Sequence, residues 1–375
     1  MPANQVVICH PVRTAIGTYG GSLKSVPATA LGAAAIAEAL RRSRLSGADI
    51  DTVVMGHVIQ AGARMNPARQ AAIGAGLPVN VPAMTVNRVC GSGAQALVSA
   101  ALEVLAGNVR CAVAGGMENM DLAPYLVPGA RWGYRMGDAT MLDSMLYDGL
   151  NDAFSGQHSG WHTEDLVAKY GIGRADQDRW AARSQQRFSA AQAAGRFDAE
   201  IAGVEVKGRK GLEIFGRDEH NRADTTIESL AKLKPAFRKD GTITAGNAPG
   251  LNSGGAAMIV ADRAWAEQKG IQPAARLVSY GVAAVEPGMF GIGPVPAVRQ
   301  ALAAIAIAVL RELGLPADVV NVEGGAIAHG HPIGASGAVL TTRLLHSMAR
   351  DGLKRGVVTL CIGGGQGIAL ALELT

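Results

Sequence analysis

Residues 87–97, NRVCGSGAQAL, set one cysteine directly before a Gly-Ser-Gly turn and an Ala/Leu-rich stretch that continues to residue 106. Gly91 and Gly93 cost backbone entropy and leave main-chain amides open, which a cysteine that only fills a core does not require. At the start of a helix, unpaired N–H groups and the helix dipole favour an anion, so the pKa of a thiol there is lowered. The same amides can hold a developing oxyanion. Cys90 is therefore either a packing residue or a nucleophile, and the rest of the chain has to distinguish the two.

The segments around this turn alternate between short apolar runs and Ala/Leu-rich stretches. Strands are expected at residues 5–9, 52–59 and 111–116, and helices at residues 28–42 and 93–106. Such alternation predicts an α/β fold with a largely parallel sheet and helices on its faces. From about residue 121 to residue 245, charge, Trp, Tyr and Gly increase, although residues 175–194 keep a helical pattern. We expect this long excursion to carry binding surface.

A second segment near the C-terminus loosely repeats the first. The stretch CGSGAQALVSAALEVLAG…AVAGG starts at Cys90, and GASGAVLTTRLLHSMA…TLCIGGG starts at Gly334. Each contains a Gly/Ser turn, an Ala/Leu-rich helix and a strand that ends in glycines. An internal duplication would produce two similar layers packed together, with a site where the two turns converge.

Composition excludes several classes of function. Of 375 residues, 48% are hydrophobic and 18% charged, and a net charge of +4 is too small and scattered for a nucleic-acid-binding protein. The longest apolar run, residues 301–310, is too short to span a membrane, and the first residues lack the pattern of a secretory signal. Cys9, Cys90, Cys111 and Cys361 form no C-x-x-C pair and have no zinc-like spacing. This pattern fits reduced thiols in the cytoplasm.

Two further glycine-rich turns carry groups that can transfer protons. In HGHPIGASGA, residues 329–338, His331 would project as a base or an oxyanion donor. His329 and His331 form an H-x-H pair, but no third ligand has convincing spacing for a metal site, so a core histidine is the alternative. In LCIGGGQG, residues 360–367, Cys361 is either a core residue or a second acid–base group, and a phosphate loop is disfavoured because no helix pattern follows. Two cysteines and a histidine on glycine turns favour acyl transfer through a thioester.

Along nearly its whole length the sequence resembles the thiolases, in particular the short-chain acetyl-CoA C-acetyltransferases. Matching segments, in the order of the family, include VRTAIGTYGGSL, NRVCGSGAQAL, AGGMENM, TAGNAPGLNSGGAA, GGAIAHGHPIGASGA and CIGGGQG. The resemblance implies a five-layered αβαβα fold of two similar halves with an inserted loop domain. Residues 1–120 and 245–270 would form the N-terminal half, residues 121–244 the loop domain for CoA binding and oligomer contacts, and residues 271–375 the C-terminal half.

The resemblance also implies the chemistry. Cys90 would be the nucleophile that takes the acyl group, His331 would activate it and help to stabilise the enolate oxygen, and Cys361 would exchange the α-proton of the second acyl-CoA. The main-chain amides of Cys90 and Gly363 would form the oxyanion hole. Acyl-CoA and coenzyme A would be the partners as substrates, with no cofactor or metal, no nucleic acid and no membrane, in a homodimer or homotetramer. The positions that match the family's CoA- and substrate-binding residues are Leu150, His158, Arg222, Ser229, Phe237, Ala245, Leu251 and Phe290. A solvated side chain is the alternative for Arg222, and simple packing is the alternative for the apolar members.

Some positions depart from the family pattern. Ser159 stands where a methionine lines the acyl pocket, Phe290 differs from many members, and Glu323 and His329 replace an asparagine and an apolar residue. A larger departure lies near residues 301–310, where the family has a further loop, a strand and an NEAF motif, whereas this chain continues RQALAAIAIAVLREL. The missing asparagine would hold a water of the second oxyanion hole. Loss of one such donor typically costs about a hundred- to a thousand-fold in rate.

Three functions follow from these observations. The leading expectation is the reversible Claisen condensation of two acetyl-CoA to acetoacetyl-CoA and CoA, by a ping-pong reaction through an acyl group on Cys90. A catalytically impaired acyl-CoA-binding protein is favoured by the missing block and opposed by the intact Cys90, His331 and Cys361. A thiolase for a slightly longer chain, such as 3-ketovaleryl or ketoadipyl, is favoured by Ser159 and Phe290. A cysteine hydrolase is disfavoured because no Asn or Asp recognisably orients the Cys–His pair.

Overall fold

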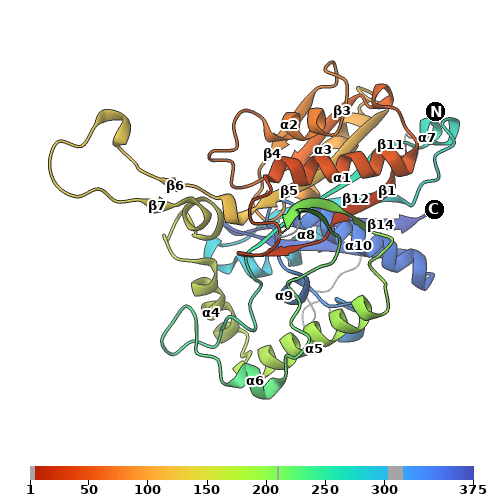
Figure 1. The fold of residues 1–375 in the computed structure, drawn as a ribbon. Helices are drawn as coiled ribbons and strands as arrows, with labels where there is room; N and C mark the ends of the chain where they lie inside the picture. Colours follow the sequence, from red (N-terminus) through yellow and green to blue (C-terminus); the bar gives the residue numbers. More distant parts are fainter. Residues whose placement is uncertain (1–4, 209–210, 303–315) are drawn as a thin grey trace.

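A computed structural model describes residues 5–208, 211–302 and 316–375 of the chain (Figure 1). The larger strands are β1 (Val6–Thr14), β3 (Thr52–Gly56), β4 (Ala83–Val86), β5 (Cys111–Asn119), β11 (Asn252–Asp262), β12 (Ala275–Ala284), β13 (Arg355–Ile362) and β14 (Gln366–Leu374). The helices of the body are α1 (Ala28–Ser43), α2 (Pro67–Gly74), α3 (Ser92–Leu105), α7 (Arg263–Gln268), α8 (Pro294–Ala301), α9 (Ala326–His329) and α10 (Ser336–Asp351). No described helix is both long and apolar enough to cross a membrane.

The strands lie side by side in the order β13-β14-β12-β1-β11-β5-β3-β4. Short strands β2 (Gly17–Thr18) and β8 (Ile201–Ala202) pair with β11 and β1 respectively. β1 and β12 join the N-terminal strands to the C-terminal ones through a short antiparallel contact at Val7 and Ile8.

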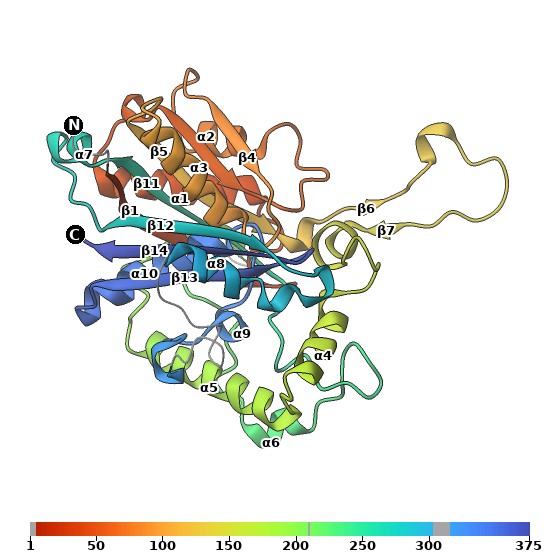
Figure 2. The ribbon, with the colours of Figure 1, turned by 180° about the vertical axis from the view of Figure 1, so that it is seen from behind.

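Helices cover both parts of this sheet in layers. α3 and α10 lie between the N-terminal strands and the C-terminal strands, and one apolar cluster includes residues of both helices and both sets of strands. α1 and α2 cover the other face of the N-terminal strands, and α8 packs on the other face of the C-terminal strands. The five layers are therefore helix, sheet, helix, sheet and helix, in agreement with the expected α/β architecture (Figures 1 and 2).

The expectation of a largely parallel sheet was wrong. β3 runs parallel to β4 and β5, and β8 runs parallel to β1, but the other pairs are antiparallel. β13 and β14 are joined by a turn of three glycines, which is too short for the crossover that parallel neighbours require. Similar glycine-rich turns in the sequence therefore do not indicate whether the neighbouring strands are parallel or antiparallel.

The two halves repeat the same order but differ in width. α3 is followed by β5 beside β11, and α10 is followed by β13 beside β14. Beyond β5 the N-terminal half continues with β3 and β4, whereas β13 has no further neighbour among the described residues. The shortening expected near residues 301–310 falls largely on residues 303–315, which lie outside the described residues.

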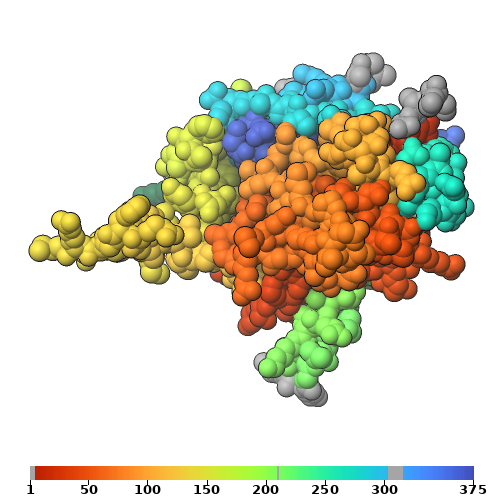
Figure 3. Space-filling view, turned by 90° about the horizontal axis from the view of Figure 1, so that it is seen from above, coloured from red at the N-terminus to blue at the C-terminus, as the bar shows by residue number. Residues whose placement is uncertain are grey.

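Residues between β5 and β11 form an excursion from the body. It contains the helices η4 (Met145–Leu150), α4 (Ser159–Lys169), α5 (Arg174–Ala193) and α6 (Ile227–Ala231), and the hairpins β6–β7 (Tyr125–Leu126, Leu142–Asp143) and β9–β10 (Val204–Gly208, Gly211–Phe215). The excursion also contains the 3-10 turns η2 (Met120–Leu122) and η3 (Ala130–Trp132), and the 3-10 turns η1 (Gly47–Asp49), η5 (Pro287–Ile292) and η6 (Ala317–Val319) lie elsewhere. The segment between β6 and β7 projects far from the body as an arm (Figures 1 and 3).

Buried charges fasten this excursion to the body. The Arg13 guanidinium is fully buried and pairs with Glu200 at 2.6 Å and with Asp218 at 2.7 Å. Arg343 of α10 lies against the rings of Phe188 and Phe197 in the same region. A buried ion pair that lost one partner would leave an uncompensated charge, so these contacts fix the position of the excursion.

Candidate active site

A strained turn presents Cys90 immediately before α3. Val89 has a φ of +45°, which a β-branched residue rarely adopts. The Arg88 N–H donates to Ser92 Oγ at 2.8 Å, and Ser92 Oγ donates to the Val89 carbonyl at 2.6 Å. These bonds close the turn on itself, so the thiol of Cys90 is held at the start of the helix.

A second turn places His331 opposite, immediately before α10. The main-chain N–H of His331 donates to Asn252 Oδ1 at 2.8 Å. His331 Nδ1 lies 2.7 Å from Ser336 Oγ, and this hydroxyl donates its hydrogen to the Pro332 carbonyl at 2.9 Å. Ser336 must therefore accept from Nδ1–H, which leaves Nε2 of the neutral ring free to take up a proton.

Glycines, which have no side chain, let the turn before α3 and the turn before α10 meet. A Cβ on Gly93 would lie 2.7 Å from the Ala338 nitrogen, and a Cβ on Gly337 would lie 2.2 Å from the Ala94 nitrogen. Both distances are far below van der Waals contact, so only glycine permits this approach. The convergence of the two turns that the duplication predicted is therefore present in the fold.

The third turn completes the group at the end of β13. Cys361 is the penultimate residue of the strand, and Gly363 follows it. The main-chain N–H groups of Gly363 and of Cys90 itself lie near enough to the Cys90 sulfur to lower its pKa, and the neighbouring Cys361 raises it. The structure thus brings together Cys90, Cys361 and both amides that were expected to form an oxyanion hole.

Burial dominates the ionisation of all three side chains. Burial raises the pKa of the Cys90 thiol to about 12, with the neighbouring Cys361 as the next cause, and the N–H groups of Gly363 and Cys90 lower it only partly. Burial likewise raises the pKa of Cys361. The lowered thiol pKa expected at a helix N-terminus was therefore wrong for the unliganded protein, because desolvation outweighs the helix and its amides. Burial lowers the pKa of His331 to about 4, so the ring is a neutral proton acceptor at pH 7.

Apolar residues surround the Cys90 thiol on the side of the excursion. Cys90, Leu150 and Leu251 pack against one small cluster, formed by Val58, Ile59, Met120, Met145 and Ile333. Ser159 is one of the positions that depart from the family pattern in sequence. Its Oγ donates to the Leu150 carbonyl at 2.5 Å, so this hydroxyl is bound to the main chain. Phe290 lies on η5, which packs against β13 and β14.

The remaining expected CoA contacts fall into two places. The His158 ring stacks on Phe237 with centroids 4.6 Å apart. Arg222, Ser229 and Ala245 line one cavity of about 220 Å³ between α5, α6 and the segment before β11. This cavity is large enough for part of a nucleotide, and Arg222 supplies a cation for phosphate or a flat surface for a base.

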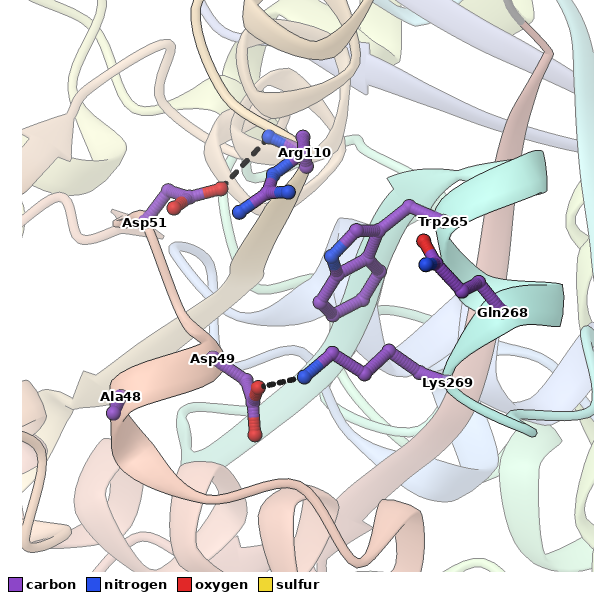
Figure 4. Close-up of a pocket in the computed structure, with 7 residues that line it drawn as sticks. All are labelled: Ala48, Asp49, Asp51, Arg110, Trp265, Gln268 and Lys269. Atoms are coloured by element: carbon purple, nitrogen blue, oxygen red, sulfur yellow. Dashed lines mark hydrogen bonds and ion pairs between the residues drawn. The ribbon is translucent and has the colours of Figure 1, made fainter.

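A second cavity, of about 390 Å³, lies at the other end of the N-terminal strands (Figure 4). Lys269 and Asp49 form an ion pair across it, and Asp51 accepts from the main-chain N–H of Arg110 at 2.7 Å. None of the expected site residues lines it. Its charged groups are largely engaged with one another, so it has no evident role in acyl transfer.

Sequence reasoning missed a buried acid beneath the site. Glu118 is completely buried at the end of β5, and its carboxylate accepts from the Gly334 N–H at 3.0 Å. A single acidic residue within CAVAGGMEN, a strand whose nine residues are all buried, was the available signal. Asn252 and Ser336 were also missed, because only the fold places them beside His331.

The metal alternative for the H-x-H pair finds no counterpart in the described part of the chain. His329 is buried, and among the described residues neither of its ring nitrogens has a hydrogen-bond partner. The same part of the chain holds no group of three or more His, Cys, Asp or Glu side chains that could bind a metal ion. His329 is thus a core residue.

Comparisons with known proteins identify the family of the chain. The family model for the thiolase N-terminal domain matches residues 6–264, and that for the thiolase C-terminal domain matches residues 298–374. An acetyl-CoA acetyltransferase of Pseudomonas aeruginosa is 52% identical, with 98% of each chain covered. The Bacillus anthracis acetyl-CoA acetyltransferase is 41% identical, with a TM-score of 0.96 over 100% of this chain and 99% of that chain. A human mitochondrial 3-ketoacyl-CoA thiolase solved with CoA is 38% identical, with a TM-score of 0.95 over 100% of this chain and 98% of that chain. The chain belongs to the thiolase family.

Proposed function

We propose that Cys90, His331 and Cys361 carry out the acyl transfer in this protein. As a thiolase-family acyltransferase, it forms and cleaves short 3-ketoacyl-CoA by Claisen condensation and thiolysis. The observation that carries the assignment is the close approach of the turns before α3 and α10, at Gly93 and Gly337, with Gly363 and Cys361 of the third turn beside the Cys90 sulfur. The free Nε2 of His331, on the facing turn, supports a role as the base for this thiol.

In the cleavage direction, the proposed steps balance as follows. The Cys90 thiol gives its proton to His331 Nε2, and its sulfur bonds to the keto carbon of acetoacetyl-CoA. The bond between the keto carbon and the α-carbon of the thioester then breaks. This α-carbon, now part of the departing acetyl-CoA, takes the proton of Cys361. Coenzyme A then gives its thiol proton to the Cys361 thiolate and attacks the acetyl group. Cys90 leaves as a thiolate and recovers its proton from His331.

Coenzyme A is proposed to lie along the excursion. The cavity lined by Arg222, Ser229 and Ala245 would take the nucleotide end, and the His158–Phe237 stack would border the pantetheine. Leu150 and Leu251 would guide the chain to Cys90, because they pack against the same cluster as the thiol. Ser159 and Phe290 border the acyl end in this scheme, and the smaller Ser159 favours chains slightly longer than acetoacetyl.

A weakened enzyme is the second candidate. The matches to the relatives from Pseudomonas aeruginosa and Chromobacterium violaceum run over 387 and 389 residues, more than the 375 residues of this chain. These relatives therefore have residues without a counterpart here, which supports the proposed absence of the NEAF block. The missing donor would stabilise the enolate, so its loss would slow the making and breaking of the carbon–carbon bond more than acylation of Cys90 by acetyl-CoA.

One assay separates these candidates. The protein is incubated with acetoacetyl-CoA and CoA, while loss of the ketoacyl thioester and acylation of Cys90 are followed by absorbance and mass spectrometry. Turnover that Cys90→Ala abolishes and Cys111→Ala preserves supports the enzyme, since Cys111 is buried in β5 away from the three turns. Labelling of Cys90 in a parallel incubation with acetyl-CoA, without turnover of acetoacetyl-CoA, supports the weakened form. Turnover that survives in Cys90→Ala would refute the assignment.

The domain bounds, the assembly and the location of the protein are part of the same proposal. We assign residues 1–120 and 245–270, 121–244, and 271–375 to the N-terminal half, loop domain and C-terminal half. A homodimer or homotetramer is proposed because the arm of the excursion exposes apolar side chains. A cytoplasmic location is proposed because the four cysteines are unpaired.

A further inference from the structure

Glu118 contacts the elements that carry both reacting turns. Its Oε2 accepts from the Gly334 N–H at 3.0 Å and from the Val58 N–H at 3.1 Å. Its Oε1 accepts from the Ile59 N–H at 3.4 Å and lies 3.2 Å from His57 Nε2. Gly334 belongs to the turn between His331 and α10, so this carboxylate holds the His331 turn to the ends of β3 and β5.

The contacts of Glu118 suit a carboxylate. Its main-chain hydrogen-bond partners are all N–H donors, so a carboxylic acid proton would find no acceptor among them. His57 Nε2 lies beside the same carboxylate, and among the described residues His57 Nδ1 is buried without a partner. The carboxylate places a negative charge beneath the site.

This charge acts on both reacting side chains. Burial lowers the pKa of His331, and the Glu118 carboxylate opposes that shift. Burial also raises the pKa of Cys90, and Glu118 adds to that shift as one of the smaller causes. The charge thus favours a proton on the imidazole and disfavours a free thiolate.

We propose that Glu118 is a positioning residue for acyl transfer: it holds the His331 turn beside Cys90, and its charge stabilises the imidazolium that forms during attack. In that step the S–H bond of Cys90 breaks, the proton binds His331 Nε2, and the sulfur electron pair bonds to the acyl carbon as the carbonyl π pair moves onto its oxygen. A free thiolate would react with any electrophile, whereas a proton passed to His331 only during attack confines reactivity to a bound substrate. The inference rests on the roles of Cys90 and His331 proposed above.

Glu118→Gln tests it, because the side chain keeps its shape and loses its charge. Turnover of acetoacetyl-CoA and CoA at pH 8 is expected to fall about tenfold or more in kcat, with KM changed less than threefold. Alkylation of Cys90 by iodoacetamide is expected to become several-fold faster, because loss of the negative charge lowers the thiol pKa. A purely structural defect would not slow turnover while speeding alkylation. Glu118→Asp, which keeps the charge, is expected to recover most of the turnover.

Glu164→Gln is the matched control. Glu164 is also buried and accepts from the main-chain N–H groups of Thr242 and Ile243, but it lies in α4 and contacts neither reacting turn. Loss of the Glu164 carboxylate in this variant is expected to leave the rate of Cys90 alkylation unchanged. If Glu118→Gln is too unstable to assay, His57→Phe decides: without the His57 donor the carboxylate charge is less shielded, and Cys90 alkylation is expected to slow.

Three outcomes would overturn the inference: unchanged turnover in Glu118→Gln, slower alkylation in that variant, or an unchanged alkylation rate in His57→Phe when only that variant is stable. Failure of the proposed function looks different, because Cys90→Ala would then retain turnover. An inactive Cys90→Ala together with a fully active Glu118→Gln would refute the role of Glu118 and leave that of Cys90 intact.

Discussion

Val89 adopts a backbone conformation that is strained for a β-branched residue. A β-branched residue at a φ of +45° is strained by about 1–3 kcal/mol, and the two hydrogen bonds of Ser92 in the same turn offset part of that cost. The strained residue directly precedes Cys90, so it sets the conformation from which the thiol projects at the start of α3. Because burial raises the pKa of this thiol to about 12, little thiolate exists before the substrate arrives, and the nucleophile depends on its base.

His329→Leu is expected to stabilise the protein, and more so in acid. Both ring nitrogens of His329 are buried without partners, which costs about 1–3 kcal/mol at neutral pH. Burial, aided by the charges of Arg343 and Arg13, lowers its pKa well below 6.5. Below pH 6.5 the unfolded chain therefore binds a proton that the folded protein does not, and stability falls as pH falls. Urea denaturation at pH 7.5 and pH 5.5 measures the difference.

The gain from His329→Leu should grow by up to about 1.4 kcal/mol for each pH unit below 6.5. An equal gain at both pH values would mean that His329 ionises similarly in the folded and unfolded chains. Loss of stability at pH 7.5 would mean that the imidazole makes a favourable contact in the folded protein.

At the scale of elements, the contact between α3 and α10 decides whether Cys90 and His331 face each other. Gly337→Ala would place a Cβ 2.2 Å from the Ala94 nitrogen, and main-chain atoms cannot yield as a side chain can. We expect a loss of about 1–3 kcal/mol in unfolding free energy. Turnover should fall as well, because separating the helices moves both reacting turns. Thermal denaturation and the acetoacetyl-CoA assay measure the two effects.

Gly216→Ala is the control for this contact. A Cβ at Gly216 would have no neighbour within 4 Å, so neither stability nor turnover should change. Unchanged behaviour in Gly337→Ala would show that the two helices can separate without consequence for the site.

The sequence predicted these elements better than their contacts. The helix expected at residues 93–106 is α3 (Ser92–Leu105), and that expected at residues 175–194 is α5 (Arg174–Ala193), because their apolar periods are regular. Gly91 was expected only to leave its main-chain amide open, and its φ of −82° is one that any residue adopts. A Cβ there would lie 2.5 Å from Ile362 Cδ1, a contact between residues far apart in the chain that the sequence does not predict.

At the scale of the whole molecule, the two halves have unequal support. The N-terminal half places β3 and β4 beyond β5, whereas β13 ends the sheet among the described residues. Val357 of this outer strand is 37% exposed. Cys361 and Gly363 lie at the end of the same strand, in the half that has fewer strands among the described residues.

Contacts across the whole molecule were the least predictable part of the site. Arg13 meets Glu200 and Asp218 across about two hundred residues of sequence, and Glu118 meets Gly334 across a similar distance. A local pattern carries no information about which distant acid a buried base will meet. Cys90, His331 and Cys361 could be named in advance because each lies on its own recognisable glycine turn.

The arm between β6 and β7 gives the last prediction. Trp132 and Met136 are 88% and 97% exposed on a projection that contacts little of its own chain (Figure 3). Apolar groups in such numbers on an isolated arm favour burial against a second copy. Trp132→Ser with Met136→Ser should therefore shift the protein to a smaller assembly in analytical ultracentrifugation, without changing its circular dichroism.

The hairpin of β9 and β10 supplies the control for the arm. Leu212 and Ile214 of β10 are 75% and 67% exposed, so Leu212→Ser with Ile214→Ser removes a similar apolar area elsewhere. If both double variants shrink the assembly alike, general surface hydrophobicity drives association rather than the arm. If neither does, the arm is not an assembly contact, and its exposed side chains need a different partner. Only a shift confined to the arm variant would support the homotetramer.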